Sequence, residues 1–335
     1  NLFPVGGGAG FGGGGATKND SQLTTDNQQE TSAEEIMATS TEEILATSTP
    51  EEIITDVTPP DITAVVAECA HSFVSEACVI ATSTAHLSWS SLSPDLSFYS
   101  VVIDDQFSAI STETEAELNL SEGQHSIKVL AYDASGNVGT SSPTIIEYIK
   151  MPLVISEIAW AGTAQSSFDE WFELYNRTNY TINLNSISLR AIDGTPDIQL
   201  SGNIIPNSYF LIERSDDDSV PEIRADLVTT FSGSAPGSGG LGNSGEELFL
   251  VQNVADSEII LDKTLTISTC SGWCFGNSSS FETMARSNLD GLGDDINNWA
   301  SDTYFNENIY NTSGALIVGT PKAPYVYIPD VSVTD

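Results

Sequence analysis

Basic residues are scarce in this sequence. Lys and Arg number 10 in 335 residues, against 47 Asp and Glu, so the formal net charge is -37. Nucleic acids and anionic lipid surfaces are bound mainly through basic side chains. We therefore expect neither as a partner and no membrane insertion, whereas divalent cations and basic surfaces suit this charge.

Long apolar runs and an N-terminal methionine are also missing. No stretch of about 18 apolar residues is present, so no membrane-spanning helix is predicted. The chain begins at Asn1 without a visible secretory signal, as expected for a mature product cut from a precursor. We predict an extracellular or cell-surface protein from which the signal peptide has been removed.

The sequence lacks the motifs of common hydrolases, metalloproteases and nucleotide-binding proteins, such as G-x-S-x-G, H-E-x-x-H and the P-loop. Its three histidines are His71, His86 and His125, and the last lies on an expected strand, where a structural role is favoured. Glu170 and Glu173 are interpreted as capping and cross-strand contacts. No catalytic residue is predicted, and we expect a protein that is not an enzyme.

Cysteine occurs four times, in two close pairs: Cys69 with Cys78, and Cys270 with Cys274. We predict two local disulfide bonds, because close pairs in a β-rich, acidic chain are typical of oxidising compartments. A zinc site is the alternative, although these spacings do not form the usual C-x-x-C repeat.

The N-terminal region leaves two interpretations open. Residues 1–16 are an apolar tetrapeptide and a Gly tract, which suit a linker. They also suit an arm in which Leu2, Phe3, Val5 and Phe11 fill pockets on a neighbouring copy. Residues 17–58 repeat an acidic Ser/Thr/Glu unit with too few apolar residues to bury a core, which favours a solvated linker. The alternative is a segment that its repeated Ile pairs order against a partner surface.

Residues 59–149 are predicted to form a first β-sandwich, because residues 86–93 and 96–104 alternate at period two. Residues 123–149 read as a strand, a tight D-A-S-G-N turn and a final strand. This pattern resembles bacterial immunoglobulin-like and fibronectin type III-like modules. The resemblance implies that Trp89 fills the core.

Residues 153–176 read LVISEIAWAGTAQSSFDEWFELYN, which is two strand-like runs around a polar connector. In the second run Phe172 and Leu174 point to one side, and Trp171, Glu173 and Tyr175 to the other. We expect one buried face and one exposed polar face. The pattern resembles the opening of a lamin tail domain, an immunoglobulin-like β-sandwich of nuclear lamins and secreted bacterial proteins.

Further segments carry this resemblance, in the same order as in the family, across residues 150–325. They are I-N-L-N-S-I-S-L-R, N-I-I-P-N-S-Y-F-L-I-E-R, G-N-S-G-E-E-L-F-L-V-Q-N, I-I-L-D, and an ending of F-E-T-M-A-R, N-W and G-T-P-K-A-P. The resemblance implies a second sandwich. Extra length near residues 264–280 and 303–314 is interpreted as surface loops, and residues 326–335 as a C-terminal strand or tail.

Acidic loops predict tentative calcium sites, because hard cations take oxygen ligands at such turns. None has the full EF-hand spacing, so a solvated turn is the alternative at each place, and hairpin chemistry alone also explains the D-A-S-G-N turn. No other cofactor is expected. The tentative ligands are Asp216, Asp217, Asp218, Asn288, Asp290, Asp294, Asp295, Asp133 and Asn137.

These observations predict an all-β chain of two immunoglobulin-like β-sandwiches in tandem, behind an extended Gly-rich and acidic Ser/Thr/Glu-rich N-terminal arm. The expected function is that of a non-enzymatic extracellular structural protein, a subunit of a surface layer or filament. Its partners would be other copies of itself, joined through the arm. The alternative is a cell-surface adhesin or a binding module of a larger secreted protein, with a surface polymer or glycan as partner.

Overall fold

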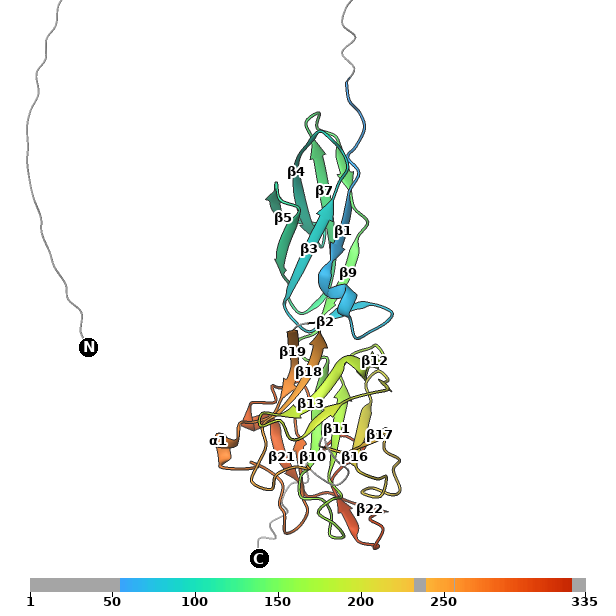
Figure 1. The fold of residues 1–335 in the computed structure, drawn as a ribbon, viewed down its shortest axis with the longest axis vertical. Coiled ribbons are helices and arrows are strands. Elements are labelled where there is room, and N and C mark those ends of the chain that lie inside the picture. The colour runs from blue at the N-terminus through green and yellow to red at the C-terminus, as the bar shows by residue number, and fades with distance from the viewer. Residues whose placement is uncertain (1–54, 232–238, 256, 327–335) are drawn as a thin grey trace, which may run out of the picture. The chain divides into compact units, whose positions relative to one another are not determined.

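The computed structural model describes residues 55–231, 239–255 and 257–326, which form the all-β structure that the sequence predicts (Figure 1). They belong to one compact unit. Within this part of the chain, no helix is long and apolar enough to cross a membrane. The predicted arm residues Leu2, Phe3, Val5 and Phe11 lie outside the described residues.

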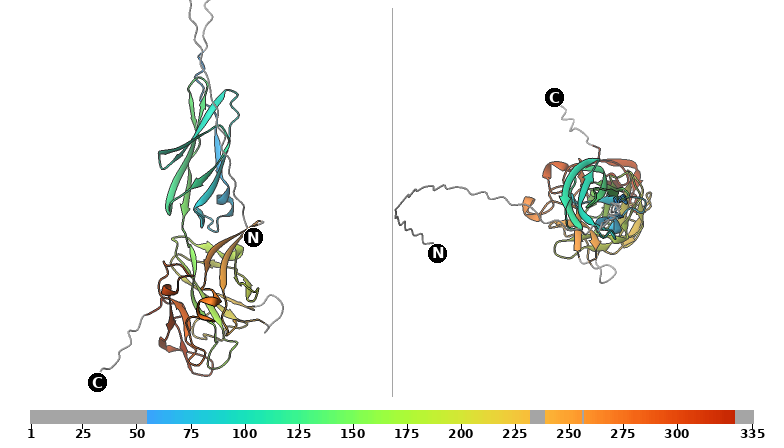
Figure 2. Two further views of the ribbon diagram at one scale, coloured as in Figure 1. Left: turned by 90° about the vertical axis from the view of Figure 1, so that its left-hand side faces the viewer. Right: turned by 90° about the horizontal axis from the view of Figure 1, so that it is seen from above.

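The first sandwich has a sheet of order β1-β3-β6 and a sheet of order β2-β9-β7-β4-β5, with β8 paired to β7. Figure 2 shows them as two layers. The strands are β1 (Thr63–Val66), β2 (Cys78–Ile80), β3 (Thr84–Ser90), β4 (Leu96–Ile103), β5 (Gln106–Ser111), β6 (Glu115–Asn119), β7 (Gly123–Asp133), β8 (Val138–Thr140) and β9 (Thr144–Tyr148), and the 3-10 helix η1 spans Ala67–His71.

Strand alternation places the core of the first sandwich. Every second residue of β3 is buried, namely Ala85, Leu87 and Trp89. The Trp89 ring meets the Tyr99 ring edge-on, with 5.5 Å between centroids. Trp89 therefore lies in the core, as the sequence predicts.

The second sandwich has a sheet of order β17-β16-β11-β10-β20-β21 and a sheet of order β14-β13-β18-β19; β12 pairs with β15, and β22 with β23. The elements are β10 (Leu153–Ala159), β11 (Trp171–Asn176), β12 (Ile182–Asn183), η2 (Leu184–Ser186), β13 (Ile187–Ala191), β14 (Asp197–Gln199), β15 (Asn203–Ile204), β16 (Tyr209–Arg214), β17 (Leu227–Thr229), β18 (Leu248–Val254), β19 (Ser257–Lys263), α1 (Ile267–Cys270), β20 (Thr283–Arg286), η3 (Ile296–Asn298), β21 (Trp299–Asp302), β22 (Phe305–Tyr310) and β23 (Leu316–Val318).

Strand β11 is buried on both faces, so the expectation of one exposed polar face is wrong. Trp171 and Glu173, which point away from the main core, are 1% and 0% exposed. The cover is a second apolar cluster that contains Trp171 together with Ile309 of β22 and Ile317 of β23. The prediction of a loop at residues 303–314 is wrong for the same reason, because this segment contributes β22 to that cover.

The Cys69–Cys78 disulfide closes a loop whose apolar tip packs into the second sandwich. Phe73 and Val74 are 3% and 4% exposed and belong to the core cluster of β10–β21 rather than to that of the first sandwich. The backbone N–H of Asn183 donates to the Phe73 carbonyl oxygen at 2.9 Å. The stapled loop therefore ties residues of the two cores together.

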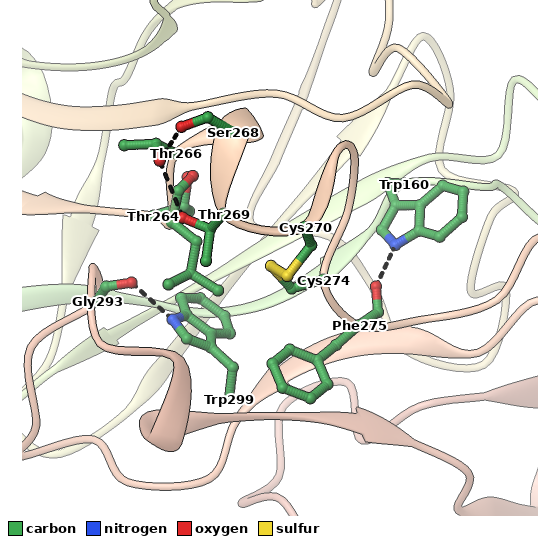
Figure 3. The surroundings of a disulfide bond; sticks show 11 residues. Trp160, Thr264, Thr266, Ser268, Thr269, Cys270, Cys274, Phe275, Gly293 and Trp299 are labelled. Atoms are coloured by element: carbon green, nitrogen blue, oxygen red, sulfur yellow. Dashed lines mark hydrogen bonds between the residues drawn. A yellow bond between two sulfur atoms is a disulfide. The ribbon is translucent and has the colours of Figure 1, made fainter.

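The Cys270–Cys274 disulfide lies among aromatic side chains (Figure 3). The indole N–H of Trp160 donates to the Phe275 carbonyl oxygen at 2.9 Å, and that of Trp299 donates to the Gly293 carbonyl oxygen at 2.7 Å. Both predicted disulfides are thus formed, and each holds an irregular segment against a core.

Candidate functional site

A groove of about 580 Å³ is lined by η1, β2, β3 and the β18–β19 hairpin. Its apolar lining includes Val79, Ile80, Ala81, Val254 and Ile259. Pockets of this size and apolar character are typical of ligand-binding sites. In the following, "the groove" refers to this feature.

A hydrogen bond across the groove fixes its geometry. The side-chain amide of Gln252, on β18, donates to the carbonyl oxygen of His71, at the end of η1, at 2.6 Å. Both residues line the groove. The two sides are also joined through the Phe73 and Val74 loop, so the groove belongs to one packed unit.

Glu68 and His86 form the charged part of the wall. The imidazole Nδ1 lies 2.6 Å from Glu68 Oε1, and the backbone N–H of His86 donates to Glu68 Oε2 at 2.8 Å. The hydrogen bond that the imidazolium donates to Glu68, followed by the negative charge of Glu68, raises the pKa of His86. The pair holds the ring in place, and the His86 side chain is 65% exposed.

The wall formed by β19 offers main-chain groups as well as side chains. Strand β19 is the last strand of its sheet among the described residues, so its outer edge has no partner strand there. Ser257 and Glu258 are exposed, Ile259 is half-buried and Ile260 is 54% exposed. An open edge of this kind accepts an added strand through backbone hydrogen bonds.

Buried carboxyl groups gather elsewhere, around β10 and β11. Glu157 accepts hydrogen bonds from the Thr283 hydroxyl and from the backbone N–H of Thr320. The Thr320 hydroxyl oxygen lies 3.0 Å from Glu157 Oε2 and 2.9 Å from Asp302 Oδ2. Burial, followed by repulsion from Asp302, raises the pKa of Glu157 to about 8. Burial and then Glu157 itself raise the pKa of Glu173 well above its usual range.

These carboxyl groups are buried, since Glu157, Glu173 and Asp302 are 1%, 0% and 0% exposed. Their partners are hydroxyl and backbone groups of β10, β20 and the G-T-P segment, so they join strands to the C-terminal segment. Glu170 and Arg214 form another buried pair, with Arg214 Nη1 2.9 Å from Glu170 Oε2, and burial raises the pKa of Glu170 to about 7. The contacts of Glu170 with Arg214 and of Glu173 with the backbone N–H of Lys322 join elements that are distant in the sequence.

His125 lies on β7 and is held by the first sandwich's own groups. Its Nδ1 lies 2.7 Å from Asp104 Oδ2, and its Nε2 lies 2.8 Å from the carbonyl oxygen of Ser121. Although desolvation opposes the shift, the Asp104 hydrogen bond raises the pKa of His125. Both ring nitrogens are used inside the sandwich, in keeping with a structural histidine.

Most of the tentative calcium ligands serve other contacts. Asp290 pairs with Arg177 at 2.8 Å and Asp294 with Lys263 at 2.8 Å. The Asp295 carboxylate accepts from the backbone N–H of Asn297, Asn288 accepts from that of Asp290, and Asp217 from that of Ala225. Glu213, near Asp216 and Asp217, has an oxygen that is buried without a partner. No ligand cluster involving Asp216 or Asp218 is found in the described part of the chain.

Asp133 is the tentative ligand that the structure brings together with other acids. One oxygen each of Asp56, Asp95 and Asp133 lies within 4.8 Å of the others. Desolvation favours a higher pKa for Asp133, but hydrogen bonds from Asn137 and from the turn backbone outweigh it and lower this pKa. Desolvation and a hydrogen bond with Asp56 raise the pKa of Asp95. The Asn137 amide also donates to the Asp56 carbonyl oxygen at 3.1 Å.

Sequence analysis missed the groove and the buried carboxyl groups. The groove joins residues as distant as His71 and Gln252, which are 181 positions apart. Glu157 carried a weak signal, as an acid inside the otherwise apolar run L-V-I-S-E-I-A. Such an acid is expected to be hydrogen-bonded and to have a shifted pKa.

No family model and no curated protein matches the sequence. Among solved structures, a DUF4876 family protein from Bacteroides thetaiotaomicron aligns with 11% identity over 72% of this chain and 95% of its own, with a TM-score of 0.31. Latent PorU from Porphyromonas gingivalis aligns with 13% identity over 63% of this chain and 20% of its own, with a TM-score of 0.20.

A third similar structure is the Bacteroides ovatus protein SGBP-B of a mixed-linkage glucan utilization locus, in complex with a heptasaccharide. It aligns with 11% identity over 79% of this chain and 62% of its own, with a TM-score of 0.20. This chain thus matches about a fifth of PorU and less than two thirds of SGBP-B. At such TM-scores the similarity identifies no ligand, and the lamin tail resemblance stays a prediction.

Proposed function

We propose that this chain is a non-enzymatic, exported binding module, and that its groove holds an extended peptide segment with apolar side chains. The observation that carries this proposal is an apolar groove bordered by the open edge of β19. Apolar pockets supply affinity for side chains, and the strand edge supplies backbone hydrogen bonds.

Charge narrows the class of ligand. The chain carries a net charge of -37, and Glu68 lies in the groove wall. Acidic ligands would be repelled from such a surface, whereas uncharged or basic segments would not. The two disulfides support export, because disulfides persist in oxidising compartments.

The geometry around His86 supports binding rather than catalysis. A carboxylate holds Nδ1 of the ring, as in a catalytic triad, but a nucleophile must also reach Nε2. In the described part of the chain, no serine or threonine hydroxyl hydrogen-bonds that nitrogen, whose nearest charged neighbour is Glu117 Oε2 at 3.9 Å.

Selection from a library of random short peptides tests the proposal. We expect the immobilised chain without residues 1–16 to select apolar peptides without acids. The Ile259→Glu variant, which places a charge in the groove, should no longer select these peptides. The Ile260→Glu variant, which changes the next residue of β19 and lies outside the groove, should still select them. Peptides that bind all three proteins equally, or a failure to select any, would contradict the proposal.

We also propose a calcium ion at Asp56, Asp95 and Asp133. The observation in its favour is the approach of three carboxylate oxygens within 4.8 Å, which suits a hard cation that prefers oxygen ligands. Calcium at this place would join the start of the first sandwich to the β7–β8 turn. A calcium titration, described in the Discussion, tests it.

A further inference from the structure

We propose that the groove is occupied by this chain's own segment Leu2-Phe3-Pro4-Val5, added as a strand to the open edge of β19. This inference rests on the proposed function and names its ligand. It joins two features that are far apart in the sequence, the apolar tetrapeptide and the groove.

The chemistry of the segment matches that of the groove. Residues 1–16 contain no charged side chain, whereas residues 17–54 are rich in Asp and Glu. Glu68 lines the groove, and the chain is strongly acidic. Such a surface repels the acidic residues 17–54 but does not repel the uncharged residues 1–16. Phe3 and Val5, two positions apart, direct their apolar side chains to the same face of an extended strand.

The position of Pro4 suits an edge strand. In an extended strand, alternate residues direct their N–H and C=O groups to opposite edges. If Phe3 and Val5 bond to β19, Pro4 faces the other edge, where its missing N–H costs no hydrogen bond. The Gly residues that follow carry no side chain to obstruct close approach of the backbone.

The connection is long enough. Residues 6–54 separate the segment from Thr55, the first described residue. At roughly 3.3–3.6 Å per residue they can span at most about 160–175 Å. The longest strand of the first sandwich, β7 with 11 residues, measures about 37 Å at 3.4 Å per residue. The groove is therefore within reach, and covalent attachment raises the segment's effective concentration there.

Fluorescence anisotropy with a labelled peptide of residues 1–16 tests the inference. The receptor is the chain without residues 1–16, which keeps every residue of the described cores. We expect the peptide to bind this receptor, and to bind the full chain roughly tenfold more weakly, because the attached segment already occupies the groove.

Two matched pairs of variants locate the contact. Ile259→Glu in the receptor should weaken binding roughly tenfold or more, and Ile260→Glu should leave it unchanged. In the peptide, Phe3→Asp should weaken binding by a similar factor, whereas Ala16→Ser should not. Circular dichroism of each receptor variant shows whether the variant is folded, so that a loss of binding is not confused with unfolding.

Three results would overturn the inference. They are no binding of the peptide to the shortened chain, equal binding by the Ile259→Glu and Ile260→Glu variants, or equal binding to the shortened and full chains. If library peptides bind the groove while the peptide of residues 1–16 does not, the self-docking inference fails and the proposed binding function stands. If neither binds, both fail.

Discussion

The two sandwiches differ in where their ion pairs lie. In the first, the Lys128–Asp105 ion pair lies at the surface, with side chains that are 28% and 80% exposed. In the second, the Arg286–Asp262 pair has side chains that are 0% and 1% exposed. Among the described residues, the second sandwich buries Glu157, Asp169, Glu170, Glu173, Glu213, Asp262 and Asp302, whereas the first sandwich buries Asp133.

The difference follows from the number of covered faces. The strands of the first sandwich are covered on one face, so apolar and polar residues alternate. In the second sandwich β11 is covered on both faces by two apolar clusters. Polar residues on its second face cannot reach water and must be paired inside the protein. The predictions below ask whether that pairing controls stability, beginning with the largest expected effect.

Breaking the Arg286–Asp262 pair should produce the largest loss of stability. The Arg286 guanidinium donates to both Asp262 oxygens, at 2.9 and 3.1 Å, and lies 4.9 Å from the centre of the Trp299 ring. Arg286→Met leaves a buried carboxylate alone and should lower the free energy of unfolding by about 3–5 kcal/mol in urea titrations. Lys128→Met, at the exposed pair, should cost about 1 kcal/mol or less.

The double variant Arg286→Met/Asp262→Asn is the control. It removes the unpaired charge and keeps an amide oxygen to accept from the Ile155 backbone N–H. Most of the lost stability should return. Equal losses at the buried and exposed pairs would show that burial does not distinguish the two sandwiches.

The pH dependence of stability should come mainly from the second sandwich. The folded protein holds the Glu157 proton with a pKa of about 8, against 4.5 for the ordinary side chain. This contribution to stability is therefore complete below about pH 4.5 and is lost as pH rises through about 8. Glu157→Gln should remove a fall in unfolding free energy on the order of 3 kcal/mol between pH 5 and 8.5.

Glu76→Gln, at an exposed position of the Cys69–Cys78 loop, is the matched control for this measurement. Its unfolding free energy should follow that of the wild type at every pH. If the Glu157→Gln variant keeps the full slope, proton binding at the buried carboxyl cluster does not govern stability.

The two disulfides should differ in what they stabilise. Loop closure predicts about 2–3 kcal/mol for each, slightly more for the longer Cys69–Cys78 loop. Replacing both members of that pair by Ser should cost more than replacing Cys270 and Cys274, because Phe73 and Val74 also leave the second core. Equal changes in urea midpoint would show that the loop tip contributes little.

Calcium should give the smallest effect, and in the first sandwich alone. An ion bound only by the folded state at ten times its Kd stabilises by about 1.4 kcal/mol. The melting temperature should therefore rise with calcium in the wild type and not in Asp95→Asn. Asp290→Asn, at an acid already paired with Arg177, should behave like the wild type. A melting temperature that does not change with calcium would contradict calcium binding by Asp56, Asp95 and Asp133.

The sequence predicted what depends on local pattern. Alternation located Trp89 in the core, and the short spacings located both disulfides. It could not predict the burial of Glu173, whose carboxylate accepts from the backbone N–H of Lys322, 149 positions further along the chain. The groove was hidden for the same reason, since no local pattern reports that η1 and the β18–β19 hairpin meet.

The tentative calcium ligands show the same limit. Acid-rich turns are visible in the sequence, but their partners are not. Asp290 and Asp294 neutralise Arg177 and Lys263, whereas Asp133 meets Asp56 and Asp95. Which acid pairs with a base and which meets other acids depends on tertiary contacts.

Hydrogen exchange of the full chain and of the chain without residues 1–16 tests the central claim, that the groove accepts a strand along β19. We expect backbone amides of Ser257–Ile260 to exchange more slowly in the full chain, while amides of the exposed edge strand β5 exchange equally in both. Equal exchange along β19 in the two proteins would contradict the claim that the chain's own N-terminal segment fills the groove.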